Sequence, residues 1–523
     1  MSEKFYVTTP IYYVNDEPHI GHAYTTIAAD VLARYHRLRG RDVFFLTGTD
    51  EHGIKIVKAA REKGTTPAEL ADSVVVRFKE LWKLLNISND DFIRTSQQRH
   101  EKRVQEIIRR LLQQDEIYRG KYEGWYDEGQ EEFVTDFTAA QNDYKSAISG
   151  KPLVRYSEES WFFRLSKWIN RLIEYIESHE RFILPESRRN EILSKLRQGV
   201  GDLSISRQIA KLDGWGVPMP NDPEHSVYVW IDALSNYITA LGIPEIGDEF
   251  DGKASQYWPA DIHLIGKDIL WFHAVYWPAL LMALDMPLPE TIFAHGWWTS
   301  EGKKMSKSLG NFISFDTIEQ ICKDYCPDAF RYFLLREVPF GADGDFSLNA
   351  FKMRYNNELA NDIGNLLSRT VNMIGRYFDG KIPTPAQMEL TGIEAEFLNE
   401  PLRKLQSQAD DMITDCKFSD YIAAVLDLTT ATNRYIDKTE PFRLARQPDQ
   451  QERIATILYT CAEMVRLALF YLTPFMPDKA AEGLAHLGIS QDQIELTDEA
   501  VKFGQIRPGM SVSGPVSLFP RKI

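Results

Sequence analysis

Hydrophobic and polar positions change their period twice within the first 53 residues. Residues 4–13 (KFYVTTPIYY) are rich in β-branched and aromatic residues and lead into a loop that contains Pro18. Residues 21–40 then place Ile27, Val31 and Tyr35 at helical spacing, and Gly40 ends the pattern. Residues 42–53 (DVFFLTGTDEHG) are an apolar run that becomes a polar loop. The pattern predicts a strand, a helix and a second strand, as in a parallel sheet that is buried on both faces.

A second strand-forming region follows much later in the chain. Apolar runs return at residues 260–270 (ADIHLIGKDIL) and 290–300 (ETIFAHGWWTS), each followed by a loop or a helix. Between the two regions, residues 116–225 are richer in Tyr, Trp, Glu and Asp and contain only short apolar segments. We therefore predict that an insertion spanning residues 116–225 splits one α/β sheet domain in the sequence.

Long helical patterns replace the strands after about residue 350. They cover residues 356–378, 421–442 and 452–475, and their apolar positions recur at helical spacing. The last stretch, residues 504–523, is punctuated by glycine and proline and is too short for a further domain. The C-terminal part is therefore predicted to be a helical bundle.

Composition and charge narrow the class of protein. With 523 residues the chain exceeds what one hydrophobic core supports, so several domains are expected. The formal net charge of −15 argues against indiscriminate binding to nucleic acid or to an anionic membrane. Four cysteines do not make a disulfide framework, which favours a reducing compartment. The N-terminus has no basic leader and no uninterrupted apolar run of about 18 residues follows, so we expect a cytoplasmic protein that does not bind membranes.

The first candidate site is a pair of histidines, His19 and His22, at the start of the first predicted helix. A metal site would need three or four ligands, and no cysteine precedes Cys322. The rings could also be packed in a core. A third interpretation is an anion site, because the N–H groups at a helix N-terminus attract anions, Gly21 lets a ligand approach the backbone, and imidazoles can donate to phosphate oxygens. The pair alone does not distinguish these interpretations.

The second candidate is a glycine-bounded lysine loop at residues 302–311 (GKKMSKSLGN), which presents Lys303, Lys304 and Lys307. Taken alone, it could be no more than a solvated basic loop. It also follows a late strand of the same predicted sheet. Ligands in such sheets bind at the carboxyl ends of the strands, where the loop and the histidine pair would meet around phosphates.

The two motifs together make the sequence recognisable. HIGH (residues 19–22) and KMSKS (residues 304–308), in this order and about 280 residues apart, resemble the two signatures of the class I aminoacyl-tRNA synthetases. The chain is most similar to the methionine-specific members of that family. The similarity runs almost from end to end, through residues 9–35, 45–56, 227–242, 263–283, 357–369 and 433–442.

The resemblance implies a fold, a domain order and a reaction. The fold would be α/β, with a Rossmann-like parallel-sheet catalytic domain (residues 1–115 and 226–349, including the KMSKS loop and a stem-contact region). A connective insertion (116–225) would split this domain, and an all-α anticodon-binding bundle (350–523) would follow it. The reaction would be that of a methionine–tRNA ligase. L-methionine and ATP would give methionyl-adenylate and pyrophosphate, and methionine would then pass to the 3′-terminal adenosine of tRNA(Met) for translation initiation and elongation.

The resemblance also assigns the residues that bind ATP. His19, His22, Lys304 and Lys307 would be catalytic, with the histidines on the phosphates of the pentacoordinate state and the lysines on the β- and γ-phosphates. Gly21 and Ser306 complete the phosphate site, and Gly266, Lys267 and Asp268 match the loop that binds the adenylate. Mg²⁺ would shield the leaving pyrophosphate, although no dedicated protein ligand for it is evident.

A methionine pocket follows from the same resemblance. Asp50 would take the substrate ammonium as a charge-assisted contact. Aromatic and apolar side chains would surround the thioether, which suits sulfur–ring contacts. At family positions these are Ile11, Tyr13, Trp230, Ala233, Leu234, Tyr237, His273 and Trp277. Since a pocket selects by shape only modestly, leucine and homocysteine are the competitors to test.

For tRNA, the resemblance assigns Asn365 and Arg369, four residues apart on a predicted helix, to the anticodon CAU. The same two residues could be no more than a helix surface. Phe442 stands where family members commonly have a tryptophan, so it offers a smaller stacking area and no indole N–H. Relatives often carry an appended C-terminal dimerising module; this chain ends without one, which favours a monomer.

Zinc is not expected. Many relatives carry a knuckle of C-x-x-C pairs near a GWY sequence, but here Asp127 and Gln130 stand in the corresponding places. A carboxylate and an amide do not rebuild a structural zinc site. Cys322 and Cys326 are four residues apart without other ligands, so we interpret them as core residues.

Two other functions compete with this one. The first is a class I synthetase for another apolar amino acid or for cysteine, against which the TDEHG sequence, Trp230 and Tyr237 argue. The second is a tRNA-binding factor that has lost catalysis. Intact His19, His22, Lys304 and Lys307 argue against it, because a protein without catalysis has no reason to keep both signatures.

Overall fold

The first 50 residues fold as the strand–helix–strand unit that the periodicity predicts. The computed structural model describes residues 3–127, 132–134, 136–246, 254–300, 302–304 and 312–522. In it β1 (Lys4–Tyr13) is followed by α1 (Ile20–Leu38) and by β2 (Asp42–Asp50), which pairs with β1 in parallel. Two helices, α2 (Ile54–Glu62) and α3 (Pro67–Leu84), then lead to β3 (Asp91–Arg94).

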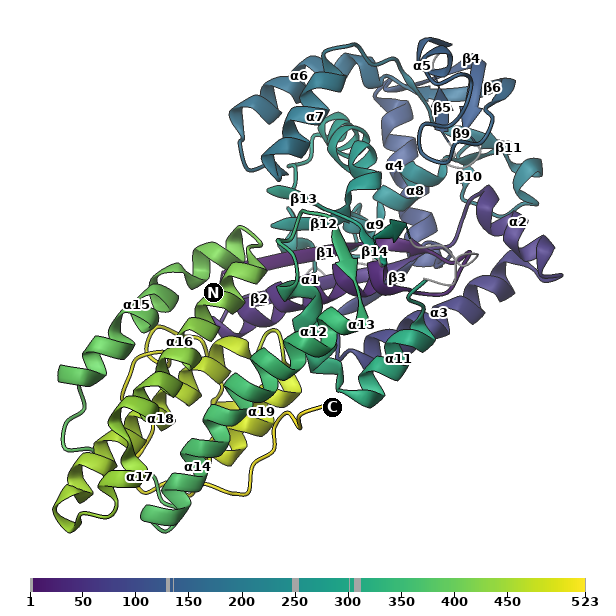
Figure 1. Cartoon of the computed structure of the whole chain (residues 1–523). Helices are drawn as coiled ribbons and strands as arrows, with labels where there is room; N and C mark the ends of the chain where they lie inside the picture. Colours follow the sequence, from purple (N-terminus) through teal and green to yellow (C-terminus); the bar gives the residue numbers. More distant parts are fainter. Residues whose placement is uncertain are drawn as a thin grey trace.

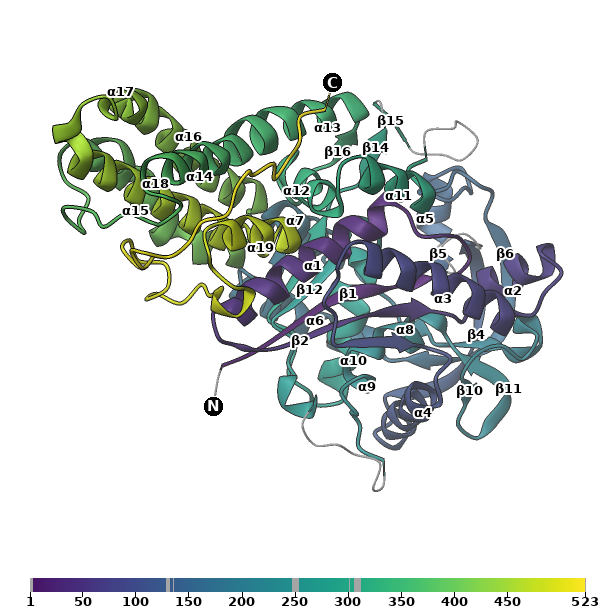
Figure 2. The same cartoon turned by 90° about the horizontal axis from the view of Figure 1, so that it is seen from below.

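A six-stranded parallel sheet forms the centre of the N-terminal part, in the order β3-β2-β1-β12-β13-β7. Its later strands are β12 (Ile262–Gly266) and β13 (Thr291–His295), as the late apolar runs predict. Side chains alternate between two cores: Val7 and Phe45 belong to the core beneath α1 and α3, whereas Tyr6 and Leu46 belong to the core on the opposite face. Figure 2 shows α1 and α3 on one side of the sheet and α4 (Gln98–Gln113) and α10 (Trp277–Ala283) on the other.

The predicted insertion contains two antiparallel sheets and one strand of the parallel sheet. The long hairpin of β4 (Ile117–Asp127) and β6 (Val154–Phe163) joins β5 (Glu132–Val134) and β8 (Leu203–Ser204), with α5 (Asp136–Gln141) between β5 and β6. The second sheet has β10 (Pro218–Met219) and β9 (Ser206–Gln208) on either side of β11 (Asp222–Val227). Between β6 and β8 in sequence lie α6 (Leu165–Ser178), β7 (Ile183–Leu184) and α7 (Glu186–Leu196). Because β7 pairs with β13, residues 116–225 are not wholly separate from the parallel sheet.

Short elements near the carboxyl edge of the sheet carry many of the candidate site residues. They are α8 (Val229–Leu234), α9 (Asn236–Thr239) and a π-helical turn, η4 (Phe272–Tyr276), that runs into α10. A small sheet of β15 (Lys303–Lys304), β14 (Trp298–Ser300) and β16 (Gly344–Phe346) follows β13, with α11 (Phe315–Asp324) and α12 (Pro327–Arg336) between β15 and β16.

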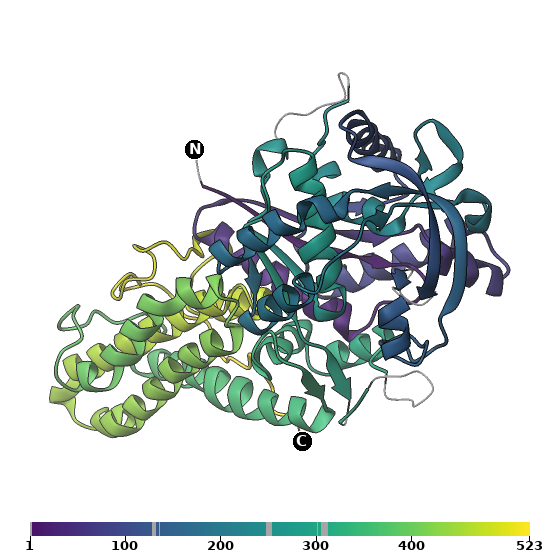
Figure 3. The same ribbon diagram turned by 90° about the horizontal axis from the view of Figure 1, so that it is seen from above.

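The C-terminal part is a helical bundle, as predicted. A continuous helix comprises α13 (Leu348–Arg354), the π-helical η6 (Tyr355–Gly364) and α14 (Asn365–Tyr377), and it is followed by α15 (Gly392–Thr414), α16 (Phe418–Thr439), α17 (Pro441–Leu444), α18 (Gln451–Leu472) and α19 (Pro477–His486). Residues 448–472, which include α18, are long and apolar enough to cross a membrane, but their apolar window is entirely buried in the bundle, so this is a core helix. Figures 1 and 3 show the bundle and the insertion at opposite ends of the molecule.

Candidate active site

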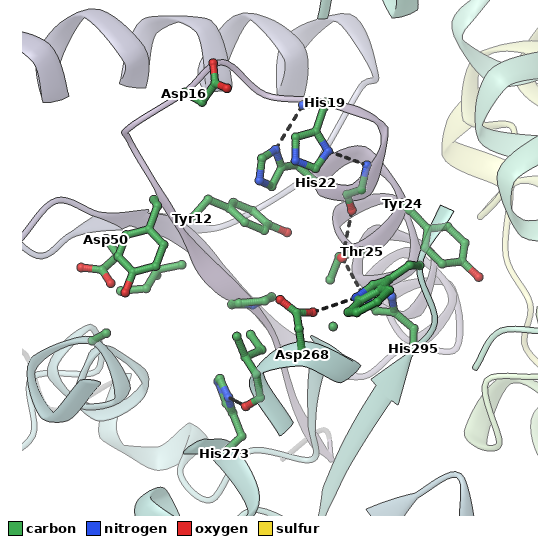
Figure 4. Close-up of a pocket in the computed structure, with 18 of the residues that line it drawn as sticks. Tyr12, Asp16, His19, His22, Tyr24, Thr25, Asp50, Asp268, His273 and His295 are labelled. Carbon is green, nitrogen blue, oxygen red and sulfur yellow. Dashed lines mark hydrogen bonds between the residues drawn. The ribbon is translucent and has the colours of Figure 1, made fainter. Parts of the chain in front are cut away.

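A cavity of about 680 Å³ lies at the carboxyl edge of the parallel sheet. The last residues of four neighbouring strands line it: Tyr13 of β1, Asp50 of β2, Gly266 of β12 and His295 of β13. This is the edge at which ligands bind in open α/β sheets. Figure 4 shows His19 and His22 at the top of the view, Asp50 to the left and His273 at the bottom.

His19 and His22 cap the N-terminus of α1 with their own rings. His19 is the N-cap residue, and its Nδ1 accepts the backbone N–H of Gly21 at 3.0 Å. His22 Nδ1 accepts the backbone N–H of His19 at 3.1 Å. Two N–H groups that a helix usually leaves for a cap or for solvent are therefore satisfied by imidazole. The metal interpretation of the pair gains no support, because no group of three or more His, Cys, Asp or Glu suited to a metal occurs among the described residues.

The capping bonds fix the tautomer of the His22 ring. Burial, and secondarily the neighbouring His19, hold the pKa of His22 well below its usual value, so the ring is neutral. A neutral imidazole carries one proton, and Nδ1 is occupied as an acceptor. The proton is therefore on Nε2, which makes this atom a hydrogen-bond donor. His19 Nδ1 is likewise occupied as an acceptor, so a single proton on that ring lies on Nε2.

Gly21 is required by the position of the His19 ring. A Cβ at residue 21 would lie 2.9 Å from Cε1 and 3.1 Å from Nδ1 of His19. Any side chain would push the ring away from the helix N-terminus. The glycine of the HIGH sequence thus serves the capping histidine, in addition to the close ligand approach expected from the sequence.

His295 is a site residue that the sequence analysis missed. Its Nδ1 donates to the Gly296 carbonyl oxygen at 2.8 Å, and its Nε2 lies 2.6 Å from the Thr25 hydroxyl on α1. Burial lowers its pKa, so the ring is neutral and Nε2 accepts from Thr25. The available signal was its position, the last residue of a buried strand at the carboxyl edge of the sheet.

The other end of the cavity is apolar and aromatic, and it gathers most of the predicted methionine pocket. Ile11, Tyr13 and Asp50 come from β1 and β2, and α8 contributes Trp230, Ala233 and Leu234. Trp230 stacks on Phe272 with ring centroids 3.7 Å apart. Asp50 is 4% exposed and pairs across the strands with Tyr13, so this end holds a buried carboxylate among rings.

Tyr237 and His273 close this end through a hydrogen bond of fixed direction. Burial lowers the pKa of His273 to about 4, so its ring is neutral. Its Nδ1 donates to the Ile269 carbonyl at 3.0 Å, which leaves Nε2 to accept the Tyr237 hydroxyl at 2.7 Å. Both side chains line the cavity. The Tyr237 hydroxyl and both ring nitrogens of His273 are hydrogen-bonded within the wall.

Two residues predicted to contact ligands lie outside the cavity wall. Trp277 is fully buried, packs beside Tyr237 and donates from Nε1 to His263 Nε2 at 3.3 Å. Lys267 forms an ion pair with Asp343, and both of its Nζ–carboxylate distances are 2.7 Å.

Gly266 and Asp268 do line the cavity, and a tryptophan missed by the sequence analysis lies beside them. Asp268 Oδ1 accepts the indole N–H of Trp297 at 3.1 Å. The Trp297 side chain is 43% exposed, lines the cavity, and lies under the Lys267 ammonium at 4.4 Å. The adenylate loop is therefore joined to an exposed aromatic ring.

The lysine loop begins beside the cavity. Lys304 ends β15, which pairs with β14, and Thr299 of β14 lines the cavity opposite Lys304 in the register. Ser306 and Lys307, also predicted to bind ATP, lie outside the described residues.

The predicted anticodon residues lie on the helical bundle. Asn365 is exposed at the start of α14, and Arg369 donates to Asp437 on α16 at 2.6 Å. Phe442 on α17 is 42% exposed. Figure 1 shows α17 at the end of the bundle remote from the parallel sheet.

Asp127 and Gln130, the residues expected in place of zinc ligands, are described only in part. Asp127 is buried at the end of β4, and Gln130 lies outside the described residues. Cys322, Cys416 and Cys461 are buried, Cys326 is partly buried, and none of them forms a disulfide. The interpretation of Cys322 as a core residue agrees with this burial.

Comparison with known proteins identifies relatives of this chain. A family model described as tRNA synthetases class I (M) matches residues 5–143 and 139–371. The methionine–tRNA ligase of Caldanaerobacter subterraneus subsp. tengcongensis is 48% identical over 521 residues, which cover 100% of this chain and 79% of that protein. The corresponding enzyme of Bacillus subtilis is 43% identical over 532 residues, covering 99% and 78% of the two chains.

Solved structures of related proteins share this fold. Mycobacterium tuberculosis methionyl-tRNA synthetase in complex with methionyl-adenylate superposes with a TM-score of 0.92 at 38% identity, covering 99% of this chain and 100% of that chain. Its free form superposes with a TM-score of 0.84 at 35% identity, covering 100% and 99%. The predicted fold class is thereby confirmed, including the parallel sheet and the C-terminal helices.

Proposed function

The chain belongs to the class I tRNA synthetase family, and from this premise we propose how its cavity carries out the reaction of the methionine-specific members. That reaction has two steps. L-methionine reacts with ATP to give methionyl-adenylate and pyrophosphate, and methionine then passes to the 3′-terminal adenosine of tRNA(Met). The methionine carboxylate supplies the nucleophile, so the protein contributes position and charge stabilisation rather than a nucleophilic side chain.

His19 and His22 hold the ATP phosphates in this proposal. Their Nε2–H donors sit at the N-terminus of a 19-residue helix, whose dipole favours an anion. Because both rings cap the helix through Nδ1, they are already oriented before ATP binds. Donors fixed in advance act on the charge that develops during displacement at the α-phosphate. This arrangement, in the same cavity as Asp50, is the observation that carries the proposal.

The lysine loop completes the phosphate site. We assign Lys304 and Lys307 to the β- and γ-phosphates, with Ser306 as a further donor, on the strength of the KMSKS sequence and of the pairing of β15 with a strand that lines the cavity. Lysine ammonium groups would neutralise the leaving pyrophosphate.

Methionine occupies the aromatic end. Asp50 accepts its ammonium group, while Trp230, Tyr237 and the other wall residues surround the thioether. Tyr237 and His273 bond to each other, so they present ring surface rather than free polar atoms to the substrate. Selection then depends on shape, and one methylene is worth only about 1–3 kcal/mol, which leaves leucine and homocysteine as competitors. Trp277 acts from behind Tyr237 as packing support.

The adenosine moiety lies along Gly266 and Asp268. The Asp268 carboxylate accepts a ribose hydroxyl, and Trp297 and His295 add an aromatic wall beside it. Lys267 contributes indirectly, by holding Asp343 and by covering the Trp297 ring.

The proposed function requires Mg²⁺ but no zinc. The described cavity residues do not gather three carboxylate or imidazole ligands, so we propose that Mg²⁺ enters bound to the ATP phosphates. We also propose that the insertion folds without zinc, since Asp127 and Gln130 replace the cysteines of the relatives' knuckle. Elemental analysis of the purified protein tests this, and one zinc per chain would contradict it.

The helical domain, residues 350–523, reads the anticodon through Asn365, Arg369 and Phe442 in this proposal. An exposed aromatic ring on α17 and a guanidinium on α14 suit stacking and edge recognition of unpaired bases. Catalysis is assigned to residues 1–115 and 226–349, with residues 116–225 as the connective insertion. We further propose that the protein works as a monomer in the cytoplasm, which light scattering tests for the oligomeric state.

Amino-acid-dependent exchange of pyrophosphate into ATP tests the central proposal. Exchange should require methionine and be weak with leucine, cysteine or homocysteine. Exchange driven by leucine or cysteine would overturn the specificity. No exchange with any amino acid would favour a tRNA-binding factor without catalysis.

A further inference from the structure

A buried cluster behind the methionine end of the cavity has no part in the chemistry proposed so far. Its centre is Asp232 on α8, which is 1% exposed. Asp232 Oδ2 lies 2.7 Å from His52 Nδ1, and Oδ1 lies 2.8 Å from His100 Nε2. The other nitrogen of His100 lies 2.6 Å from the Thr239 hydroxyl. None of these four side chains lines the main cavity.

The two hydrogen bonds to Asp232 have defined directions. Burial alone would raise the pKa of Asp232, but His52 and His100 outweigh it and bring that pKa to about 2, so the group is a carboxylate. A carboxylate only accepts, so the nitrogen of each histidine that faces it carries a proton. Burial opposes the charge on His52, yet the carboxylates of Asp232, Glu101 and Glu51 raise its pKa.

The cluster connects the two walls of the methionine end. His52 follows Asp50 by two residues at the end of β2, and Asp232 lies between Trp230 and Ala233 on α8. His100 belongs to α4, and Thr239 to α9, the helix that carries Tyr237. The loop after β2 and helix α4 therefore meet α8 at one carboxylate, and α9 joins them through His100. The helices α8 and α9 have only six and four residues, so they depend on tertiary contacts for their position.

Stability alone does not account for a charge at this place. Replacing a buried ion pair with apolar residues of similar volume is often neutral or stabilising, whereas hydrogen bonds of fixed direction specify one arrangement. Each of the two bonds to Asp232 constrains α8 relative to a different partner, the loop after β2 and helix α4.

We infer that Asp232, held between His52 and His100, is a positioning residue that sets the spacing between Asp50 and the Trp230 wall and thereby the affinity for methionine. The inference rests on the proposed roles of Asp50 and Trp230. It concerns the amino-acid end alone, because the phosphate end is organised separately by α1. Loosening the cluster should therefore affect methionine and spare ATP.

Asp232→Asn tests the inference with almost no change of size. The amide keeps one acceptor oxygen but turns an N–H₂ toward one of the two ring N–H groups, so one bond to the cluster is lost. We expect KM for methionine in pyrophosphate exchange to rise about ten-fold, with kcat and KM for ATP within about two-fold, as for lost uniform binding. Asp213→Asn, which changes an exposed carboxylate paired with Arg61, is the matched control and should leave all three constants unchanged.

Variants of His100 test the inference a second time without changing Asp232. His100→Gln can still donate to Asp232 from its terminal amide, whereas His100→Leu cannot. The inference expects near-normal KM for methionine in the first variant and a raised value in the second. If Asp232→Asn does not fold, as judged by circular dichroism and Tm, the His100 pair alone decides.

Two results would overturn the inference. One is a folded Asp232→Asn with unchanged KM for methionine; the other is an equal rise of the constants for methionine and ATP, which would indicate general destabilisation. Failure of the proposed function is distinguishable, because the unaltered protein would then show no methionine-dependent exchange at all.

Discussion

His22 Nδ1 accepts the backbone N–H of His19 at 3.1 Å, so one signature histidine caps the peptide group of the other. The two rings lie with centroids 3.9 Å apart at the start of α1, and each uses Nδ1 for the helix. What remains for a ligand on the His22 ring is Nε2–H. The helix N-terminus is thereby converted from a set of backbone donors into a pair of side-chain donors that reach farther into the cavity.

His22 variants separate the capping atom from the proposed phosphate donor. Asparagine places an amide near the Nδ1 position, and glutamine places one near Nε2. We expect His22→Asn to lower kcat for pyrophosphate exchange by about 10²–10³-fold, the usual cost of removing one transition-state donor, and His22→Gln to lower it less. Methionine binding should be unchanged in both, as measured by equilibrium dialysis. Greater activity in the asparagine variant would contradict the assignment of Nε2.

Gly21→Ala should act through His19. The added Cβ would lie 2.9 Å from His19 Cε1, which forces the ring off the cap. We expect exchange to fall by at least about 10-fold, with KM for methionine unaffected, because the loss concerns orientation of a charge-stabilising group. Gly375→Ala on α14 is the control, since a Cβ there meets nothing within 4 Å and is expected to be neutral or mildly stabilising. Equal effects of the two changes would show that Gly21 has no special role.

Periodicity predicted the elements that are long and regular. The pattern in residues 4–50 predicted β1, α1 and β2, because strand and helix periods differ and each run ends in a clear turn signal. The strand β7 escaped prediction, since two residues, Ile183 and Leu184, are too short for any period and pair only through a distant partner. For the same reason the pattern in residues 116–225 does not reveal that this range contributes a strand to the parallel sheet.

Site residues were predictable where a sequence motif carries them and less so where a local distortion intervenes. Trp277 follows His273 by four residues, a spacing that shares one face of an α-helix. The intervening turn is π-helical, which brings residues five apart into line, so Trp277 lies behind the wall instead of in it. Lys267 turns to Asp343, a partner 76 residues away that no spacing rule reveals.

Asp328 should make the stability of the fold depend on pH. Burial, opposed in part by Arg331, raises its pKa from about 3.8 to about 6, and its Oδ1 has no hydrogen-bond partner among the described residues. The folded state therefore binds a proton that the unfolded state releases between these values, and stability falls as pH rises from about 4 to 6. Asp328→Asn mimics the protonated form, so its Tm should rise relative to that of the unaltered protein as pH increases from about 4 to 6. The corresponding difference in the free energy of unfolding is at most about 3 kcal/mol.

The measurement is Tm at pH 4.5 and at pH 7.5 for both proteins, with Asp492→Asn as an exposed control. A constant difference in Tm across the range would show that Asp328 does not titrate in this window.

Arg369→Ala should separate tRNA charging from methionine activation. The guanidinium is held by Asp437 at 2.6 Å on the bundle, and it takes no part in lining the cavity. We expect kcat/KM for tRNA to fall by about 10–100-fold, corresponding to loss of a bidentate base contact, with exchange intact. Arg376→Ala on the same helix is the matched control. A parallel fall of charging and exchange would mean that the helical domain is wrongly assigned.

Phe442 offers a change that should strengthen binding. Its ring is 42% exposed on α17, at a position where the sequence resemblance implies a tryptophan in other members. Stacking of one base on an aromatic side chain is worth about 1–3 kcal/mol, and it grows with ring area. Phe442→Ala should therefore raise Kd for tRNA by about ten-fold, whereas Phe442→Trp should lower it by a few-fold, because the indole adds stacking area and a donor. Filter binding measures both, and pyrophosphate exchange should not change in either. If alanine binds tRNA as well as phenylalanine does, the exposed ring of α17 is not a stacking platform and the anticodon must meet another face of the bundle.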